Sequence, residues 1–171
     1  KEFCKAEIKK GKKENVGWIK IKGNKREGSH MIGLLYKASK AGVRVDLMVR
    51  SVCCVIPGVA NLSENITVRR IVDRFLEHSR VFIFGGDDDA VVLMGSADLM
   101  TRNWYHRIEV CLPVKDPACR KMLIDYFKMQ WEDSSKAVQL NGEQEWELVQ
   151  DRIGDAVNAQ KRIYEYLNEK T

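Results

Sequence analysis

Apolar and polar residues alternate in two segments near the start of the chain. The first, VGWIKIK at 16–22, is bounded by glycines and predicts a strand. The second, VRVDLMV at 43–49, predicts a strand whose alternate valine and leucine side chains face a core. This second strand delivers Arg50 at its carboxyl end, which is where open α/β sheets bind their ligands.

Helical spacing of apolar residues separates these two strands and returns later in the chain. Residues 31–41 are predicted to form a helix, with Ser29 as its N-cap and Gly42 as its stop. Another helix is expected from residue 117 to about residue 132, with Asp116 as its cap and a proline in its first position. The start of the chain therefore has the order of an α/β unit.

The middle of the chain predicts an antiparallel hairpin, with strands at 80–84 and 90–95 around the turn GGDDD. The segment TVRRIVDRFLEH at 67–78, which follows a loop at 57–65, has an ambiguous pattern and is assigned a helical turn before the strand. Three further elements are expected: strands at 107–114 and 136–140 and a last helix from about 155 to 168. Strands that alternate with helices, together with this hairpin, predict an α/β domain with a mixed β-sheet flanked by helices.

Charge is unevenly distributed along the 171 residues, which carry a net charge of +5. Residues 1–26 hold ten Lys or Arg against three Asp or Glu, and solvated lysines on a helix would explain the run KKGKK. No lysine occurs between residues 41 and 114. The arginines in that span are Arg44, Arg50, Arg69, Arg70, Arg74, Arg80, Arg102 and Arg107. Arginine forks onto two oxygens, so these residues indicate either bound oxyanions such as phosphates or surface ion pairs.

The five cysteines contain no CxxC pair, and the adjacent Cys53 and Cys54 suit a packed, reduced, cytosolic interior. Cysteines and histidines show no ligand spacing, so no metal site is predicted in this chain. No apolar run is long enough to span a membrane. The length suits a single domain covering 1–171, and the basic opening at Lys1 is typical of the middle of a longer protein.

Imidazole and guanidinium groups stand two residues apart at the start of the predicted hairpin, as His78 and Arg80. The hairpin places both beside GSAD at 95–98, and we expect Ser96 and Arg50 to share one phosphate-sized anion with them. Such a set can perform phosphoryl chemistry: the histidine attacks phosphorus or protonates a leaving oxygen, while the cations and hydroxyl bind the phosphate. A single histidine beside a strand is more often structural, so the surrounding sequence is needed to decide whether His78 is catalytic.

That sequence carries two resemblances. The His-x-Arg pair followed by a Gly-Ser turn resembles the phospholipase D superfamily motif. Longer blocks, including LSENI, RFLEHSR and GSADLMTRN, resemble the carboxy-terminal catalytic domain of bacterial polyphosphate kinase, over nearly the whole chain. The second resemblance implies a phospholipase D-like fold and reversible transfer of the terminal phosphate of ATP to inorganic polyphosphate, with ADP as the other product.

The resemblance to polyphosphate kinase also implies roles for individual residues. Arg50, in LMVRSVCC, matches the arginine that binds the ATP phosphates. His78, in LEHSR, matches the second histidine of the family site, which contacts the nucleotide phosphates and has an acid/base role. KGNKR stands where the family usually has KxNSL, so no role is assigned to Lys22 or Asn24, and Leu99 replaces a common tryptophan.

Partners follow from the same resemblance. The family's phosphorylated histidine and its magnesium-linked arginines belong to a preceding domain, so Mg²⁺ ligands are expected outside this chain. This chain would then supply half of an active site and be inactive when isolated. The full-length protein is expected to be a homo-oligomer in the bacterial cytoplasm or at the periphery of the inner membrane.

Two other functions fit parts of the sequence. A phospholipase D-type phosphodiesterase or nuclease would share the fold, although such enzymes usually have lysine at the position of Arg80 and asparagine at that of Asp98. A non-catalytic polyanion-binding module would use the lysines at 9–13. Nucleic acid is not expected as a partner, because the basic segment lacks the interleaved aromatic residues on which bases stack.

Overall fold

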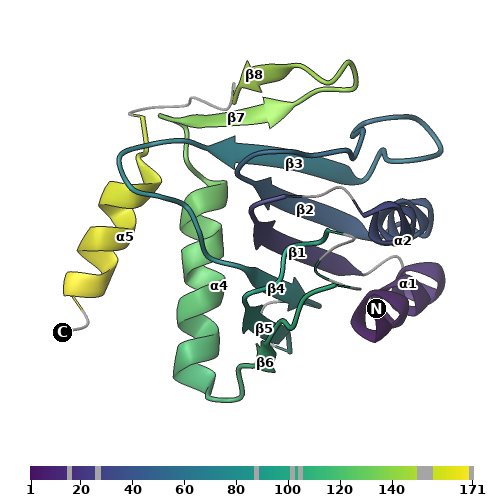
Figure 1. Cartoon of the computed structure of the whole chain (residues 1–171), viewed down its shortest axis with the longest axis horizontal. Coiled ribbons are helices and arrows are strands. Elements are labelled where there is room, and N and C mark those ends of the chain that lie inside the picture. The colour runs from purple at the N-terminus through teal and green to yellow at the C-terminus, as the bar shows by residue number, and fades with distance from the viewer. Residues whose placement is uncertain are drawn as a thin grey trace.

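The computed structural model describes residues 1–14, 17–25, 28–86, 89–100, 103, 106–149 and 156–169. Its helices are α1 (Glu2–Glu14), α2 (Ser29–Lys40), α4 (Pro117–Trp131) and α5 (Ala159–Asn168). Its strands are β1 (Trp18–Gly23), β2 (Arg44–Val49), β3 (Ile66–Ile71), β4 (Val81–Phe84), β5 (Val91–Gly95), β6 (Cys111–Pro113), β7 (Ala137–Leu140) and β8 (Trp146–Leu148). These strands form one sheet in the order β6-β5-β4-β1-β2-β3-β7-β8 (Figure 1).

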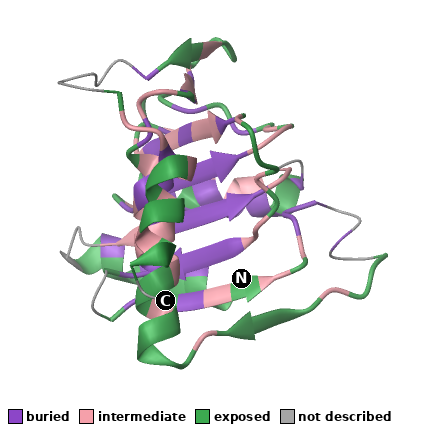
Figure 2. Cartoon of the chain, turned by 90° about the vertical axis from the view of Figure 1, so that its left-hand side faces the viewer, coloured by how far each residue is buried: buried purple, intermediate pink, exposed green. Residues whose placement is uncertain are grey.

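The sheet is mixed, as the sequence predicts. β2 is parallel to both of its neighbours, β1 and β3. The other neighbouring strands are antiparallel, including the predicted hairpin of β4 and β5. Helices cover both faces: α1 and α2 lie on one side, and α4 and α5 on the other (Figure 1). In Figure 2 the side of α4 and α5 faces the viewer, and helix lies in front of the buried central strands.

Alternation along the central strands produces two cores, one on each face of the sheet. On one face, Ile19 and Ile21 of β1 belong to the same buried cluster as Leu35 of α2. On the other face, Ile83 of β4 clusters with Phe127 of α4. Between Ile19 and Gly23, β1 turns two buried lysines toward the α4 side, and a buried ammonium needs polar partners there.

The site is positioned by the strand register at one edge of the sheet. The parallel strands β1 and β2 both end there, and the amide of Arg50 donates to the carbonyl of Gly23 at 3.1 Å. Antiparallel β4 begins at the same edge, since Val81 stands opposite Lys22. The residues just before Val81 therefore come to the edge at which Arg50 leaves β2.

The predicted helical turn over 67–78 is wrong. Residues 66–71 form β3, which pairs with β2 on one side and β7 on the other. Ile66 and Val68 are buried, as suits β-branched residues in a strand that is paired on both sides. Residues 72–80 then run without helix or strand to β4, which begins at Val81 rather than at Arg80.

Helix caps were predicted with mixed success. The side chain of Asp116 accepts a hydrogen bond from the amide of Cys119 at 2.8 Å, so its role as the cap of α4 is confirmed. The prediction for Ser29 is wrong, because α2 begins at Ser29 and its N-cap is Gly28, which has no side chain to bond. Gly42 follows α2 with φ of 81°, a conformation that favours glycine and stops the helix.

Several expected boundaries shift. β6 is shorter than the strand predicted over 107–114, β8 was not predicted, and α5 begins at Ala159 with Asn158 as its cap. Arg102, the centre of the GGDDD turn and the expected start of the last helix lie outside the described residues. Among the described helices, none combines the length and the apolar character that a membrane span requires.

Candidate functional site

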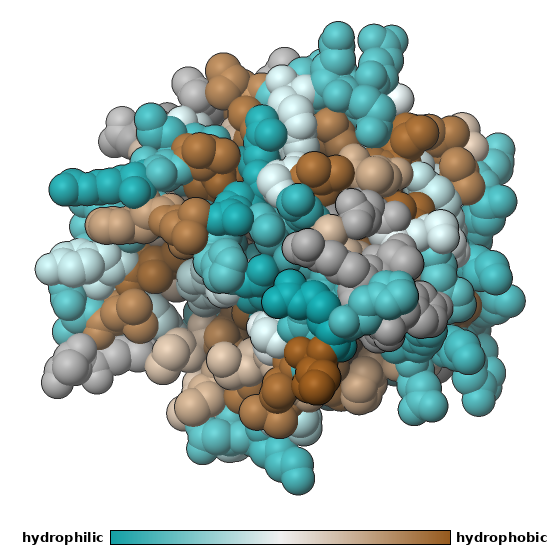
Figure 3. Space-filling view, in the orientation of Figure 1, coloured by the Kyte–Doolittle hydropathy of each residue, from teal (hydrophilic) through white to brown (hydrophobic). Residues whose placement is uncertain are grey.

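An open pocket of about 640 Å³ lies at the edge of the sheet where β4 begins. His78, Arg80 and Ser96 all line it, so it brings together three of the four predicted site residues. The remaining lining residues are Asn24, Ser79, Val81, Met94, Gly95, Asp98, Asn103, Arg107, Glu109 and Leu123. Hydrophilic residues gather through the middle of the molecular face shown in Figure 3. The pocket is polar enough to hold a charged ligand.

His78 and Arg80 contact each other directly in the segment before β4. Nη1 of Arg80 donates to the carbonyl oxygen of His78 at 2.7 Å and lies 3.0 Å from Nδ1 and 3.1 Å from Nε2 of the imidazole. A guanidinium can only donate, and its nearly equal distances to Nδ1 and Nε2 single out neither ring nitrogen as the acceptor. His78 is exposed, whereas the side chain of Arg80 is only 12% exposed. The imidazole is therefore the more accessible of the two groups.

Asp98, which sequence reasoning did not assign to the site, fixes Arg80. Its Oδ2 accepts from Nη2 of Arg80 at 3.0 Å, and its Oδ1 accepts from the amide of Asn24 at 2.7 Å. Asp98 is buried, so these contacts join the end of β1 to the segment that carries His78. The sequence feature that could have identified Asp98 is its place as the acidic last residue of GSAD, two residues after Ser96.

Ser96 is held by a carboxylate rather than pointing free into the pocket. Its hydroxyl donates to Oε2 of Glu109 and accepts from the amide of Val110 at 3.1 Å. The bond from Ser96 lowers the pKa of Glu109, and bonds from Asn103 and the charge of Arg107 act in the same direction. Glu109 is therefore ionised near neutral pH, and Ser96 would have to leave it to donate to a phosphate.

Arg50 lies beside the pocket, not in its lining. Its Nε donates to Oδ1 of Asn24 at 2.7 Å, and Asn24 does line the pocket. Within the described part of the chain, no carboxylate pairs with Arg50, so its terminal nitrogens are available to an anion. Asn24, which the sequence left without a role, connects this arginine to the site.

Glu77, one residue before His78, is the centre of a polar cluster beneath the site. Its carboxylate accepts hydrogen bonds from four side chains: Lys22 (2.8 Å), Tyr126 (3.2 Å), Gln130 (2.5 Å) and Gln160 (2.8 Å). Burial raises the pKa of Glu77, but the charge of Lys22 and these hydrogen bonds outweigh burial, so the pKa lies below its ordinary value. Lys22 thus has a structural partner inside the domain.

Replacing Lys22 with methionine is expected to destabilise the domain by about 3–5 kcal/mol, because Glu77 would keep a buried charge without its ionic partner. The side chains of Lys22 and Glu77 are only 3% and 10% exposed. Urea unfolding at neutral pH measures the change in the free energy of unfolding. The control is Lys121→Met, which breaks an exposed pair with Asp125 and should cost about 1 kcal/mol or less.

The cost of Lys22→Met is also expected to shrink in acid. Because the folded pKa of Glu77 is depressed, the ion pair contributes fully above the ordinary glutamate value of 4.5. That contribution is lost as the pH falls through the folded pKa. A cost that stays constant from neutral pH to well below 4.5 would mean that the ion pair is not its source.

The family model for polyphosphate kinase C-terminal domain 2 matches residues 1–160. The chain belongs to this polyphosphate kinase family. It is 41% identical over 162 residues to the polyphosphate kinase of Vibrio parahaemolyticus, covering 95% of this chain and 23% of that protein. It is 37% identical over 169 residues to polyphosphate kinase 1 of Chlorobaculum tepidum, covering 99% of this chain and 24% of that protein.

Solved structures agree with this family and confirm the predicted phospholipase D-like fold. The polyphosphate kinase of Porphyromonas gingivalis superimposes with a TM-score of 0.94 at 38% identity, over 99% of this chain and 26% of that one. Nuc from Salmonella typhimurium, a phospholipase D family member, superimposes with a TM-score of 0.56 at 14% identity, over 80% of this chain and 89% of that one. The second likeness concerns the fold alone.

The chain spans about a quarter of the length of the polyphosphate kinases it matches. A longer polypeptide was expected from the sequence, and these relatives are consistent with it. Roles for His78, Arg50, Arg80 and Ser96 stay predictions, because family membership alone assigns none of them.

Proposed function

We propose that residues 1–171 form a single domain that supplies half of an active site in a longer, cytoplasmic polyphosphate kinase. That enzyme would reversibly transfer the terminal phosphate of ATP to inorganic polyphosphate. The observation that carries this proposal is the convergence of His78, Arg80 and Ser96 in one polar pocket of a chain that belongs to this family.

His78 is assigned the proton transfer of the reaction. A neutral imidazole carries a proton on one of its two nitrogens, and that N–H can donate to a phosphate oxygen once the ring turns toward it. The bond that breaks joins the γ-phosphorus of ATP to the oxygen that leaves with ADP. Protonation of this oxygen stabilises it as it departs.

The cations are assigned to the phosphates. Arg50 would place its two terminal nitrogens on oxygens of the ATP phosphates, while its Nε stays with Asn24. Arg80 is already paired with Asp98, so it would add a weaker attraction and chiefly hold His78. Ser96 would bind the same anion after turning from Glu109.

The phosphorus acceptor is assigned to the other half of the site. In polymer synthesis the γ-phosphorus would bond to a histidine nitrogen of the preceding domain, then pass to the terminal oxygen of polyphosphate. Magnesium is not assigned here, because no group of three or more His, Cys, Asp or Glu side chains that could hold a metal exists among the described residues.

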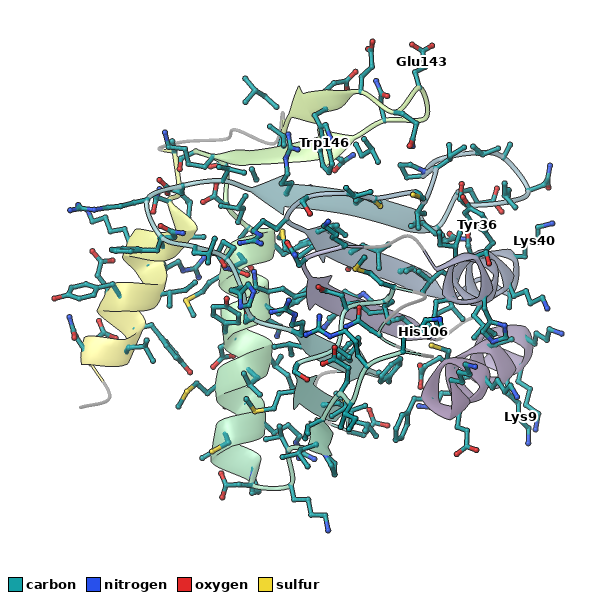
Figure 4. The ribbon with its side chains drawn as sticks, in the orientation of Figure 1. Lys9, Tyr36, Lys40, His106, Glu143 and Trp146 are labelled. Carbon is teal, nitrogen blue, oxygen red and sulfur yellow. The ribbon has the colours of Figure 1, made fainter. Side chains whose placement is uncertain are left out.

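The alternative of a polyanion-binding module rests on the lysines of α1. Those lysines lie on the opposite side of the sheet from α4, and Lys9 projects outward with Lys40 of α2 (Figure 4). The pocket with His78 lies at the edge of the sheet where β4 begins, and Leu123 of α4 is one of its lining residues. None of the lysines at 9–13 lines the pocket, whereas His78, which can transfer a proton, does.

The proposed function is tested by incubating the full-length enzyme with radiolabelled ATP and a polyphosphate primer. Transfer of label into acid-insoluble polymer, and formation of ATP from ADP and polymer in the reverse assay, are the expected results. Release of nucleotides or of a phosphodiester product instead would identify a phospholipase D-type hydrolase and refute the proposal.

The isolated 171-residue chain is expected to bind ATP or polyphosphate weakly and to transfer no phosphate. One imidazole cannot serve both faces of an in-line displacement, whereas Arg50 and its neighbours can still hold an anion whose binding weakens with salt. Titration by calorimetry at two salt concentrations measures the binding. Polymer elongation across a range of protein concentrations, or a stable phosphohistidine at His78, would contradict the half-site assignment.

A further inference from the structure

The segment that carries His78 has no hydrogen-bonded strand or helix of its own. Residues 72–80 run between β3 and β4 in irregular conformation, and His78 is exposed within them. A catalytic side chain must be held close to its productive position, and a displacement of about 1 Å can cost a hundredfold in rate. The position of His78 therefore depends on side chains that reach this segment from other elements.

Tyr126 of α4 reaches the residues on both sides of His78. Its hydroxyl lies 2.8 Å from Oγ of Ser79 and 3.2 Å from Oε2 of Glu77. Burial raises the pKa of Tyr126, so the phenol keeps its proton and donates to the carboxylate. The hydroxyl of Ser79 then donates to the phenol oxygen, and the three groups form one directed chain.

Helix α5 holds the earlier part of the same segment. Gln160 accepts from the amide of Phe75 at 2.9 Å and donates to the carbonyl of Phe75 at 2.9 Å. The same amide group of Gln160 also donates to Glu77 at 2.8 Å, while Asn158 donates to Asp73 at 2.6 Å. The backbone before His78 is thus fixed from α5, and the residues that flank His78 are fixed from α4.

We propose that Tyr126 is a positioning residue for His78: its hydroxyl holds Glu77 and Ser79 together and so aims the imidazole into the pocket. This inference rests on the proposed function, because it gives His78 a reacting role. Tyr126 itself does not line the pocket, so it acts through the two residues it binds.

Tyr126→Phe in the full-length enzyme tests this directly, since it removes one oxygen atom and keeps the ring. We expect kcat to fall about tenfold, which is less than the hundredfold loss that a displacement of about 1 Å can cause. The KM for ATP should stay close to that of the wild type, because Arg50 is held by Asn24 and not by Tyr126. A change in kcat without a change in KM is expected if His78 is misplaced. Thermal unfolding of each variant measures whether the variant remains folded.

The matched control is Tyr166→Phe. The hydroxyl of Tyr166 donates to Asp125 at 2.8 Å, so this variant also removes a phenolic oxygen that joins two elements, here α5 and α4, but one that does not contact the segment of His78. This variant should retain the wild-type kcat. Equal losses of kcat in both variants, or no loss in Tyr126→Phe, would overturn the inference.

Hydrogen–deuterium exchange of the peptides that cover residues 75–80 gives a readout that needs no activity. Tyr126→Phe should exchange faster there than the wild type, while Tyr166→Phe should not. Unchanged exchange in Tyr126→Phe would also overturn the inference. A wild-type enzyme that transfers no phosphate would refute the proposed function separately, and the exchange rates would still decide whether Tyr126 holds this segment.

Discussion

Replacing His78 with glutamine in the full-length enzyme is expected to lower kcat for polyphosphate synthesis about a hundred- to ten-thousandfold, the range that proton transfer by a positioned side chain supplies. Glutamine retains a hydrogen-bonding side chain of similar reach but cannot exchange a proton near neutral pH. Initial rates of label transfer from ATP to polymer measure the effect. The KM for ATP should change much less, because Arg50 remains.

His30→Gln is the matched control, since His30 is exposed on α2 and is not part of the pocket lining. Its kcat should equal that of the wild type. A wild-type rate in His78→Gln would remove the imidazole from the chemistry and leave the pocket as a binding site alone.

Most of the sheet could be predicted because its strands are encoded locally. The hairpin of β4 and β5 follows from two apolar runs around a glycine-rich turn, and β1 and β2 follow from alternation. β3 could not be assigned, since its residues run on into the polar segment that leads to His78. Its strand conformation depends on pairing with β2 and β7, and β7 is about 70 residues away in the sequence.

The residues of the site also include some that the sequence predicts and some that it does not. His78, Arg80 and Ser96 could be placed together because one hairpin carries all three, and the register of Val81 with Met94 determines their approach. Alternation along a shared strand was not the reason, since His78 and Arg80 precede β4 and meet through a bond from the guanidinium to the carbonyl of His78.

The supporting residues could not be predicted, because they come from distant parts of the chain. Tyr126 and Gln160 are 49 and 83 positions from Glu77, so only the docking of α4 and α5 brings them together. Glu109 belongs to the strand predicted over 107–114, part of which forms β6 and pairs with β5. The sequence did not give the register of that pairing, so it could not place Glu109 beside Ser96.

Arg50→Lys is expected to weaken the enzyme about ten- to hundredfold while leaving the domain folded. A lysine keeps one positive charge but loses the planar fork that can bind two phosphate oxygens at once. A charge-assisted hydrogen bond contributes about 1.5–3 kcal/mol, which corresponds to that range of rates. The effect should be visible in kcat/KM for ATP, and chiefly in KM if Arg50 binds the ground state and the transition state equally.

The hydrogen bond from Arg50 to Asn24 allows the effect of Arg50→Lys on stability to be separated from its effect on nucleotide binding. Nε donates to Oδ1 of Asn24 at 2.7 Å, so Arg50→Lys also removes this bond and leaves that oxygen with the longer bond from the hydroxyl of Ser51 at 3.4 Å. That loss should lower the free energy of unfolding whether or not ATP is present, whereas loss of the fork should appear only in nucleotide binding. Arg44→Lys is the control, since Arg44 is 57% exposed at the opposite end of β2 and pairs with Asp46. Wild-type nucleotide affinity and turnover in Arg50→Lys would remove Arg50 from the site, even if the variant were less stable.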